Sequence, residues 1–254
     1  MISLKQAAQP LPRNGTVVVE ANPFVHRGPI RDPAYFLGRR QELSRAFDLL
    51  RQAQSVSILG PRRIGKTSFL FHLAHPTVCQ AYGLAPERHC FVYVNCESWG
   101  DLARHELFDL LRQEMAEALR RAGHHLELHS SALPAGGYRA FEQAVRTVTE
   151  HRIQLVLMLD EFAALSANPH LDAQFFSGLR SLATRYRVAY ITVSTEILLE
   201  LTYSQTSVLS SPFFNFFAQL RLRPFSRSEA EQLLVNLAAR GGLGFGQDTL
   251  NFLL

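Results

Sequence analysis

Short, uninterrupted apolar runs alternate along this chain with longer stretches whose apolar residues recur every three or four positions. An uninterrupted apolar run predicts a strand buried on both faces, and the longer period predicts a helix with one apolar face. The predicted strands span residues 56–59, 91–95, 155–159, 188–193 and 219–222. The predicted helices span residues 36–54, 67–74, 102–122, 138–150 and 171–186. This alternation indicates an α/β domain built on a parallel sheet with helices on both faces.

The two ends of the chain differ from this alternating core. Residues 1–35 contain prolines and glycines that break long elements, and only residues 17–20 have a strand-like pattern. At the other end, Ser226 and Glu229 form a capping box, which predicts a helix that is stopped at Gly241 and followed by a second helix. We therefore expect an N-terminal arm over residues 1–35, a core domain over residues 36–225, and an incomplete helical domain over residues 226–254.

The composition predicts a folded globular protein, with 47% hydrophobic and 19% charged residues. Its net charge of +4 is carried by arginines, because lysine occurs only at Lys5 and Lys66. These arginines alternate with acidic residues, which favours solvated helix faces over a nucleic-acid-binding patch. No apolar run is long enough to span a bilayer, and the N-terminus has no signal-peptide pattern.

Neither the cysteines nor the histidines predict a metal centre. The three cysteines have no metal-ligand spacing, and their odd number favours a reduced, cytoplasmic compartment. His125 and His129 are four residues apart, with His124 and Glu127 nearby. However, these residues follow Gly123, where the helix is expected to end, so a solvent-facing loop is the favoured interpretation.

The most specific motif follows the first predicted strand. Residues 60–67 match G-x-x-x-x-G-K-[ST], with a strand before them and a helix after them, as a phosphate-binding loop requires. The backbone N–H groups of such a loop cradle phosphates, the Lys66 ammonium would reach the β- and γ-phosphates, and the Thr67 hydroxyl would ligate Mg²⁺. The predicted nucleotide-binding residues here are Gly60, Pro61, Arg62, Arg63, Ile64, Gly65, Lys66, Thr67 and Ser68.

Acidic residues follow the third predicted strand. Asp160 and Glu161 come directly after residues 155–159, and ligands of open α/β sheets bind at the carboxyl ends of the strands. Asp160 is therefore predicted to bind Mg²⁺ through water, and Glu161 to orient or deprotonate the attacking water. Ser194, at the end of the fourth strand, would face the γ-phosphate if that strand lies beside the first, although an ordinary polar strand end explains it almost as well.

With these motifs placed, the chain resembles the additional-strand P-loop ATPases, and within them the AAA+, STAND and origin-recognition groups. Residues 36–42, Phe-Leu-Gly-Arg-Arg-Gln-Glu, look like the F-x-G-R-x-x-E segment of these groups, and residues 22–24 and 221–226 also resemble them. The resemblance implies a three-layer P-loop NTPase fold with strand order 5-1-4-3-2 and ATP held between the sheet edge and a helical lid. It also implies that Phe36, Gly38 and Arg39 lie near the adenine.

The sequence departs from these groups in its cations. Residues 191–220 contain no arginine or lysine, so a ring-type arginine finger is missing, and Arg221 and Arg223 are weak alternatives. This absence predicts a slow, regulatory, switch-like ATPase acting on a protein partner or a C-terminal effector domain. A nucleic-acid-associated ATPase of the initiator or transposition-helper type is the alternative, but its winged helix is not visible here. A module that only binds nucleotide is disfavoured by Glu161.

Overall fold

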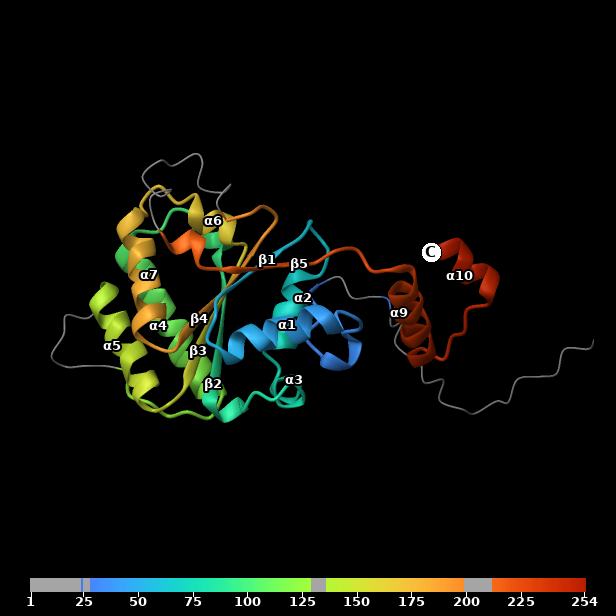
Figure 1. Cartoon of the computed structure of the whole chain (residues 1–254), viewed down its shortest axis with the longest axis horizontal. Helices are drawn as coiled ribbons and strands as arrows, with labels where there is room; N and C mark the ends of the chain where they lie inside the picture. Colours follow the sequence, from blue (N-terminus) through green and yellow to red (C-terminus); the bar gives the residue numbers. More distant parts are fainter. Residues whose placement is uncertain (1–23, 25–27, 129–135, 199–211) are drawn as a thin grey trace, which may run out of the picture. The chain divides into compact units, whose positions relative to one another are not determined.

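A five-stranded parallel sheet forms the centre of the computed structural model, which describes residue 24 and residues 28–128, 136–198 and 212–254 (Figure 1). The sheet order is β2-β3-β4-β1-β5, and every pairing is parallel. The strands are β1 (Val56–Leu59), β2 (His89–Asn95), β3 (Gln154–Asp160), β4 (Val188–Ser194) and β5 (Ala218–Arg221). This is the predicted order 5-1-4-3-2, read from the other edge.

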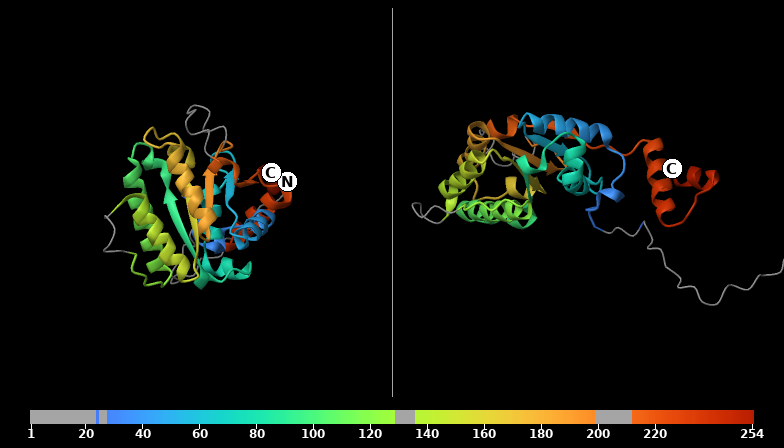
Figure 2. Two further views of the ribbon diagram at one scale, coloured as in Figure 1. Left: turned by 60° about the vertical axis from the view of Figure 1, so that its left-hand side comes forward. Right: turned by 90° about the horizontal axis from the view of Figure 1, so that it is seen from below.

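Helices cover both faces of the sheet and form the outer layers of a three-layer sandwich (Figures 1 and 2). One face packs on α1 (Arg40–Arg51), α2 (Lys66–Leu73) and α3 (Pro76–Ala81). The other face packs on α4 (Arg104–Arg121), α5 (Gly137–Glu150), α6 (Phe162–Ser166) and α7 (Ala173–Arg185). Every residue of the inner strands β1, β3 and β4 is buried, which explains why most of their residues are apolar.

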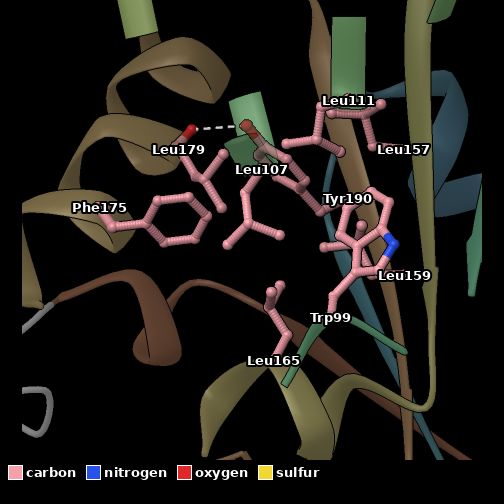
Figure 3. A pocket seen from close by; sticks show the side chains of 9 residues that line it. All are labelled: Trp99, Leu107, Leu111, Leu157, Leu159, Leu165, Phe175, Leu179 and Tyr190. Carbon is pink, nitrogen blue, oxygen red and sulfur yellow. Dashed lines mark hydrogen bonds between the residues drawn. The ribbon is translucent and has the colours of Figure 1, made fainter. Parts of the chain in front are cut away.

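The core beneath α4 and α7 is closely packed with large side chains (Figure 3). Tyr190 of β4 is completely buried there, and its hydroxyl donates a hydrogen bond to the carbonyl oxygen of Leu179 at 2.8 Å. Beside it lies an apolar void of only about 10 Å³, lined by Trp99 and leucines among others. Since a void needs polar partners to hold a water molecule, we take it to be dry packing space. This side of the sheet is therefore a closely packed apolar core.

One predicted helix begins later than expected. The apolar pattern predicted a helix from residue 36, whereas α1 begins at Arg40. Gly38 and Arg39 have φ angles of 75° and 60°, in the left-handed region that a right-handed helix cannot include. The segment before α1 is therefore free to turn back over α2. The short helices α3 and α6 were not predicted, because five or six residues are too few to show a helical period.

Residues 28–226 form one compact unit, and the C-terminal residues 227–254 belong to another. The second unit contains α9 (Arg227–Arg240) and α10 (Gln247–Leu253), which agree with the two predicted C-terminal helices. Within this unit the rings of Phe24 and Phe245 lie 6.2 Å apart. The strand expected over residues 17–20 lies outside the described residues. In the part of the chain that the structure describes, no helix has the length and apolar character needed to cross a membrane.

Candidate nucleotide-binding site

The loop between β1 and α2 needs glycine at two positions, for two different reasons. Gly65 has a φ angle of 95°, which disfavours other residues although a Cβ atom there would meet nothing within 4 Å. Gly60 has the opposite constraint, because a Cβ atom there would lie 2.9 Å from the carbonyl oxygen of Leu222. Arg63 also adopts a left-handed conformation, with φ of 65°. The left-handed residues thus give the loop its curvature, and Gly60 allows the loop to pack closely against the chain that follows β5.

Lys66, the first residue of α2, places its ammonium group inside this loop. The residue is only 7% exposed, and Nζ donates hydrogen bonds to the carbonyl oxygens of Gly60 at 2.8 Å and Pro61 at 3.0 Å. Desolvation lowers the pKa of Lys66, while the charges of Glu161 and Asp160 act to raise it. Carbonyl oxygens and acidic neighbours therefore compensate for the burial of the ammonium group.

The Asp160 carboxylate, at the end of β3, receives hydrogen bonds from three donors. Its Oδ2 atom accepts from the Thr67 hydroxyl at 2.8 Å and from the Tyr93 hydroxyl at 3.1 Å, and its Oδ1 atom accepts from the Glu161 backbone N–H at 3.0 Å. Asp160 is 3% exposed. Carboxylate and hydroxyl oxygens are the ligands that Mg²⁺ prefers, so the touching pair Thr67 and Asp160 fits a magnesium site.

Tyr93 is the site residue that the sequence analysis missed. Burial, followed by the nearby Asp160 charge, raises the pKa of Tyr93, so its hydroxyl stays protonated and donates to the carboxylate at neutral pH. Its ring lies 4.7 Å from the ring of Phe71, which in turn lies 4.0 Å from the guanidinium carbon of Arg31. No sequence signal singled it out, because Tyr93 stands near the carboxyl end of β2 in a run of apolar and aromatic residues.

The predicted water-activating and γ-phosphate residues have different surroundings. Glu161 is exposed, has a left-handed φ of 51°, and lies close enough for its charge to act on Lys66. Ser194 pairs in register with Leu59, so β4 does lie beside β1, as its predicted role requires. However, Ser194 is 2% exposed and its hydroxyl donates to the Glu196 carbonyl oxygen at 2.6 Å. The Ser194 hydroxyl therefore already donates its proton to the backbone just after β4.

The segment before α1 lies along α2. Ser68 accepts a hydrogen bond from the backbone N–H of Ile30 at 3.0 Å. The Phe36 ring stacks on His72 with centroids 4.0 Å apart. Desolvation, and then the charge of His75, lowers the pKa of His72 to about 4. Ser68 and His72 are four residues apart in α2, so residues 30–36 lie along one face of this helix. Arg62 and Arg63 are exposed on the phosphate loop.

No group of three or more potential metal ligands of the His, Cys, Asp or Glu types occurs among the described residues. His129, one member of the histidine set considered above, lies outside them. Cys79, Cys90 and Cys96 are buried free thiols, and burial raises the pKa of Cys79 and of Cys90 to about 12. These thiols are therefore packing residues.

The family is defined by a match over most of the chain. Residues 46–246 match the family described as Novel STAND NTPase 2, and the chain belongs to this family of P-loop nucleoside triphosphatases. The predicted resemblance to the AAA+ and STAND group of ATPases is thereby confirmed. A comparison with curated proteins gave no match.

Solved structures support the same fold at low sequence identity. The Walker-type ATPase PABY2304 of Pyrococcus abyssi is 15% identical with a TM-score of 0.64, over 89% of this chain and 65% of that one. The ORC2 protein of Aeropyrum pernix is 16% identical with a TM-score of 0.60, over 87% of this chain and 56% of that one. The ORC1 protein of the same organism, solved in complex with DNA, is 16% identical with a TM-score of 0.53, over 80% of this chain and 50% of that one. This chain thus spans less than two thirds of the length of each of these proteins, and the likeness concerns the fold alone.

Proposed function

We propose that this chain binds ATP with Mg²⁺ at the loop of residues 60–68 and hydrolyses it slowly, as a regulatory nucleotide switch. The observation that carries the proposal is the convergence of three groups at the carboxyl ends of the strands: the buried Lys66 ammonium, the Thr67 hydroxyl and the Asp160 carboxylate. Lys66 would exchange its carbonyl partners for the β- and γ-phosphates. Thr67 and Asp160 would hold Mg²⁺, which supplies charge neutralisation on the phosphates.

Glu161 is the proposed base, since it is exposed and directly follows the buried Asp160 in the chain. Ser194 is proposed only as a secondary γ-phosphate contact, because its hydroxyl would first have to leave Glu196. Phe36 and Gly38 are proposed to border the nucleoside side of the site. Arginine fingers accelerate phosphoryl transfer by about 10³–10⁵. The cation-free stretch of residues 191–220 therefore supports turnover far below the roughly 1–10³ s⁻¹ common among enzymes.

The switch role follows from this slow turnover. A triphosphate that persists can hold one conformation until hydrolysis removes the contacts of the γ-phosphate. We propose that residues 226–254 belong to a lid whose position depends on the bound nucleotide, and that a protein partner or an effector domain responds to this position. DNA binding by the ORC1 protein is not carried over, since the likeness at 16% identity concerns the fold.

The proposal is tested by separating metal binding from water activation. Glu161→Gln should bind ATP with normal affinity in the presence of Mg²⁺ and lose phosphate release, whereas Asp160→Asn should weaken binding only when Mg²⁺ is present. Glu87→Gln, at an exposed carboxylate before β2, is the matched control. Calorimetry and phosphate release report the two properties. Normal turnover by Glu161→Gln would remove Glu161 from its role, and failure of the parent chain to bind ATP would refute the proposed function.

A further inference from the structure

Arg39 is a buried arginine whose guanidinium group contacts a carboxylate and backbone carbonyl oxygens of the protein. It is 4% exposed and comes directly before α1 in a left-handed conformation, with φ of 60°. Its Nη1 atom lies 3.3 Å from the Glu42 carboxylate, which compensates for its charge. The family resemblance implies that Arg39 lies near the adenine. In the structure its N–H groups donate to Glu42, Ile64 and Arg223.

The guanidinium group joins the phosphate loop to the chain that follows β5. Its Nη2 atom donates to the carbonyl oxygen of Ile64, within the phosphate loop, at 3.4 Å. Its Nη1 atom donates to the carbonyl oxygen of Arg223, and its guanidinium carbon lies 4.3 Å from the centre of the Phe225 ring. Phe225 stands two residues before α9. One planar group therefore contacts both the nucleotide-binding loop and the segment that leads into α9, which we call the exit segment (residues 222–225).

The exit segment is also pressed against the phosphate loop directly. The backbone N–H of Leu222 donates to the carbonyl oxygen of Leu59 at 2.7 Å, immediately before the loop. A Cβ atom on Gly60 would lie 2.9 Å from the Leu222 carbonyl oxygen, and one on Gly38 would lie 2.9 Å from the Phe225 ring. Two glycines thus permit an approach that other residues would prevent. Because these contacts are so close, a displacement of the phosphate loop must also displace the exit segment.

We propose that Arg39 is a positioning residue that couples occupancy of the phosphate loop to the order of the exit segment. When phosphates bind the N–H groups of the loop, its peptide units are fixed, and the Ile64 carbonyl then holds the guanidinium in place. The guanidinium in turn holds the Arg223 carbonyl and the Phe225 ring. By linkage, order in the exit segment strengthens nucleotide binding by the same factor. This inference rests on the proposed function and adds the contacts through which nucleotide binding would affect the segment that leads into α9.

Lysine cannot replace arginine in this position. The contacts need a planar group that donates to two carbonyl oxygens in different directions while one face lies on an aromatic ring. An ammonium group would keep the charge beside Glu42 but lose this geometry. Arg39→Lys therefore tests the coupling while it preserves the ion pair, and Phe225→Leu tests it from the other side. The adjacent Arg40, which is exposed, provides the matched control Arg40→Lys.

The experiment is hydrogen exchange of the 254-residue chain, alone and saturated with MgADP or with a non-hydrolysable ATP analogue plus Mg²⁺. In the parent chain and in Arg40→Lys, bound nucleotide should slow exchange in peptides covering residues 221–226 by about fivefold or more. In Arg39→Lys and Phe225→Leu, nucleotide should still slow exchange of the phosphate loop, but the protection of residues 221–226 should disappear. Nucleotide affinity of these two variants should fall by a similar factor.

Each outcome decides between coupling and a purely structural role. Protection of residues 221–226 that persists in both variants would overturn the inference, as would a parent chain that binds nucleotide without protecting these residues. If melting shows that Arg39→Lys does not fold, Phe225→Leu and the parent chain still give the answer. A parent chain that binds no nucleotide in calorimetry would instead contradict the proposed function, so the two failures are distinguishable.

Discussion

Gly60→Ala should disrupt the phosphate loop through a collision that the structure locates. The new Cβ atom would lie 2.9 Å from the Leu222 carbonyl oxygen and 3.0 Å from Cγ2 of Ile64. Non-bonded carbon contacts are comfortable at about 3.5 Å, so the loop or the strand end must move by about half an ångström. Gly60 does not have a positive φ angle, so backbone strain adds nothing to this effect.

Overpacking of this size costs about 1–3 kcal/mol, which corresponds to a melting temperature lower by about 2–12 °C for a chain of this length. Nucleotide affinity should fall about tenfold, because the shift also moves the backbone N–H groups of the loop that are proposed to bind the phosphates. The control is Gly100→Ala, where the nearest atom is at 3.7 Å and the change should stay below about 1 kcal/mol. Thermal melting and calorimetry measure both effects. If Gly60→Ala were as stable and as tight-binding as Gly100→Ala, the close approach of Leu222 would be refuted.

Three further perturbations test separate parts of the site. Tyr93→Phe should raise the Mg²⁺ concentration at half-saturation about tenfold in titrations with ATP, and leave metal-free nucleotide binding unchanged. Burial lowers the pKa of His72 to about 4, so between pH 6.5 and 4 the unfolded chain binds a proton that the folded chain does not bind. The melting temperature should therefore fall as the pH decreases from 6.5 to 4, and it should fall less in His72→Gln. Phosphate release per molecule should not change with protein concentration, either in the parent or in Arg221→Ala and Arg223→Ala; a steep rise abolished by one variant would indicate an arginine supplied by a second copy.

The positions of the inner strands along the chain were predictable because burial leaves a clear mark on the sequence, whereas the order of the strands was expected only from the family resemblance. β3 and β4 are buried along their whole length, and five of the seven residues in each strand are apolar or aromatic. The limits were less certain than the existence of the strands: β3 extends one residue beyond its predicted range at each end, and the edge strand β5 begins and ends one residue earlier than predicted. The predicted start of α1 was wrong for a different reason. The apolar spacing continues through Gly38 and Arg39, whereas their left-handed backbone keeps the helix from beginning before Arg40.

The site was predictable only where its residues are neighbours in the chain. Lys66 and Thr67 belong to one motif, and Asp160 follows an apolar strand, so local patterns were enough to propose them. Tyr93 and Phe225 reach the site from β2 and from the exit segment through tertiary contacts. No local pattern encodes such contacts, because they depend on which strands become neighbours and on where glycines allow close approach.

The central claim, that nucleotide binds through the buried ammonium of the phosphate loop, is tested most directly by calorimetry of Lys66→Ala with ATP and Mg²⁺. Each charge-assisted contact is worth about 1.5–3 kcal/mol, so affinity should fall at least about tenfold. Lys5→Ala, at the only other lysine of the chain, should bind like the parent. Melting temperatures of all three proteins should be similar without nucleotide. Equal ATP affinities for the parent and Lys66→Ala would contradict the account.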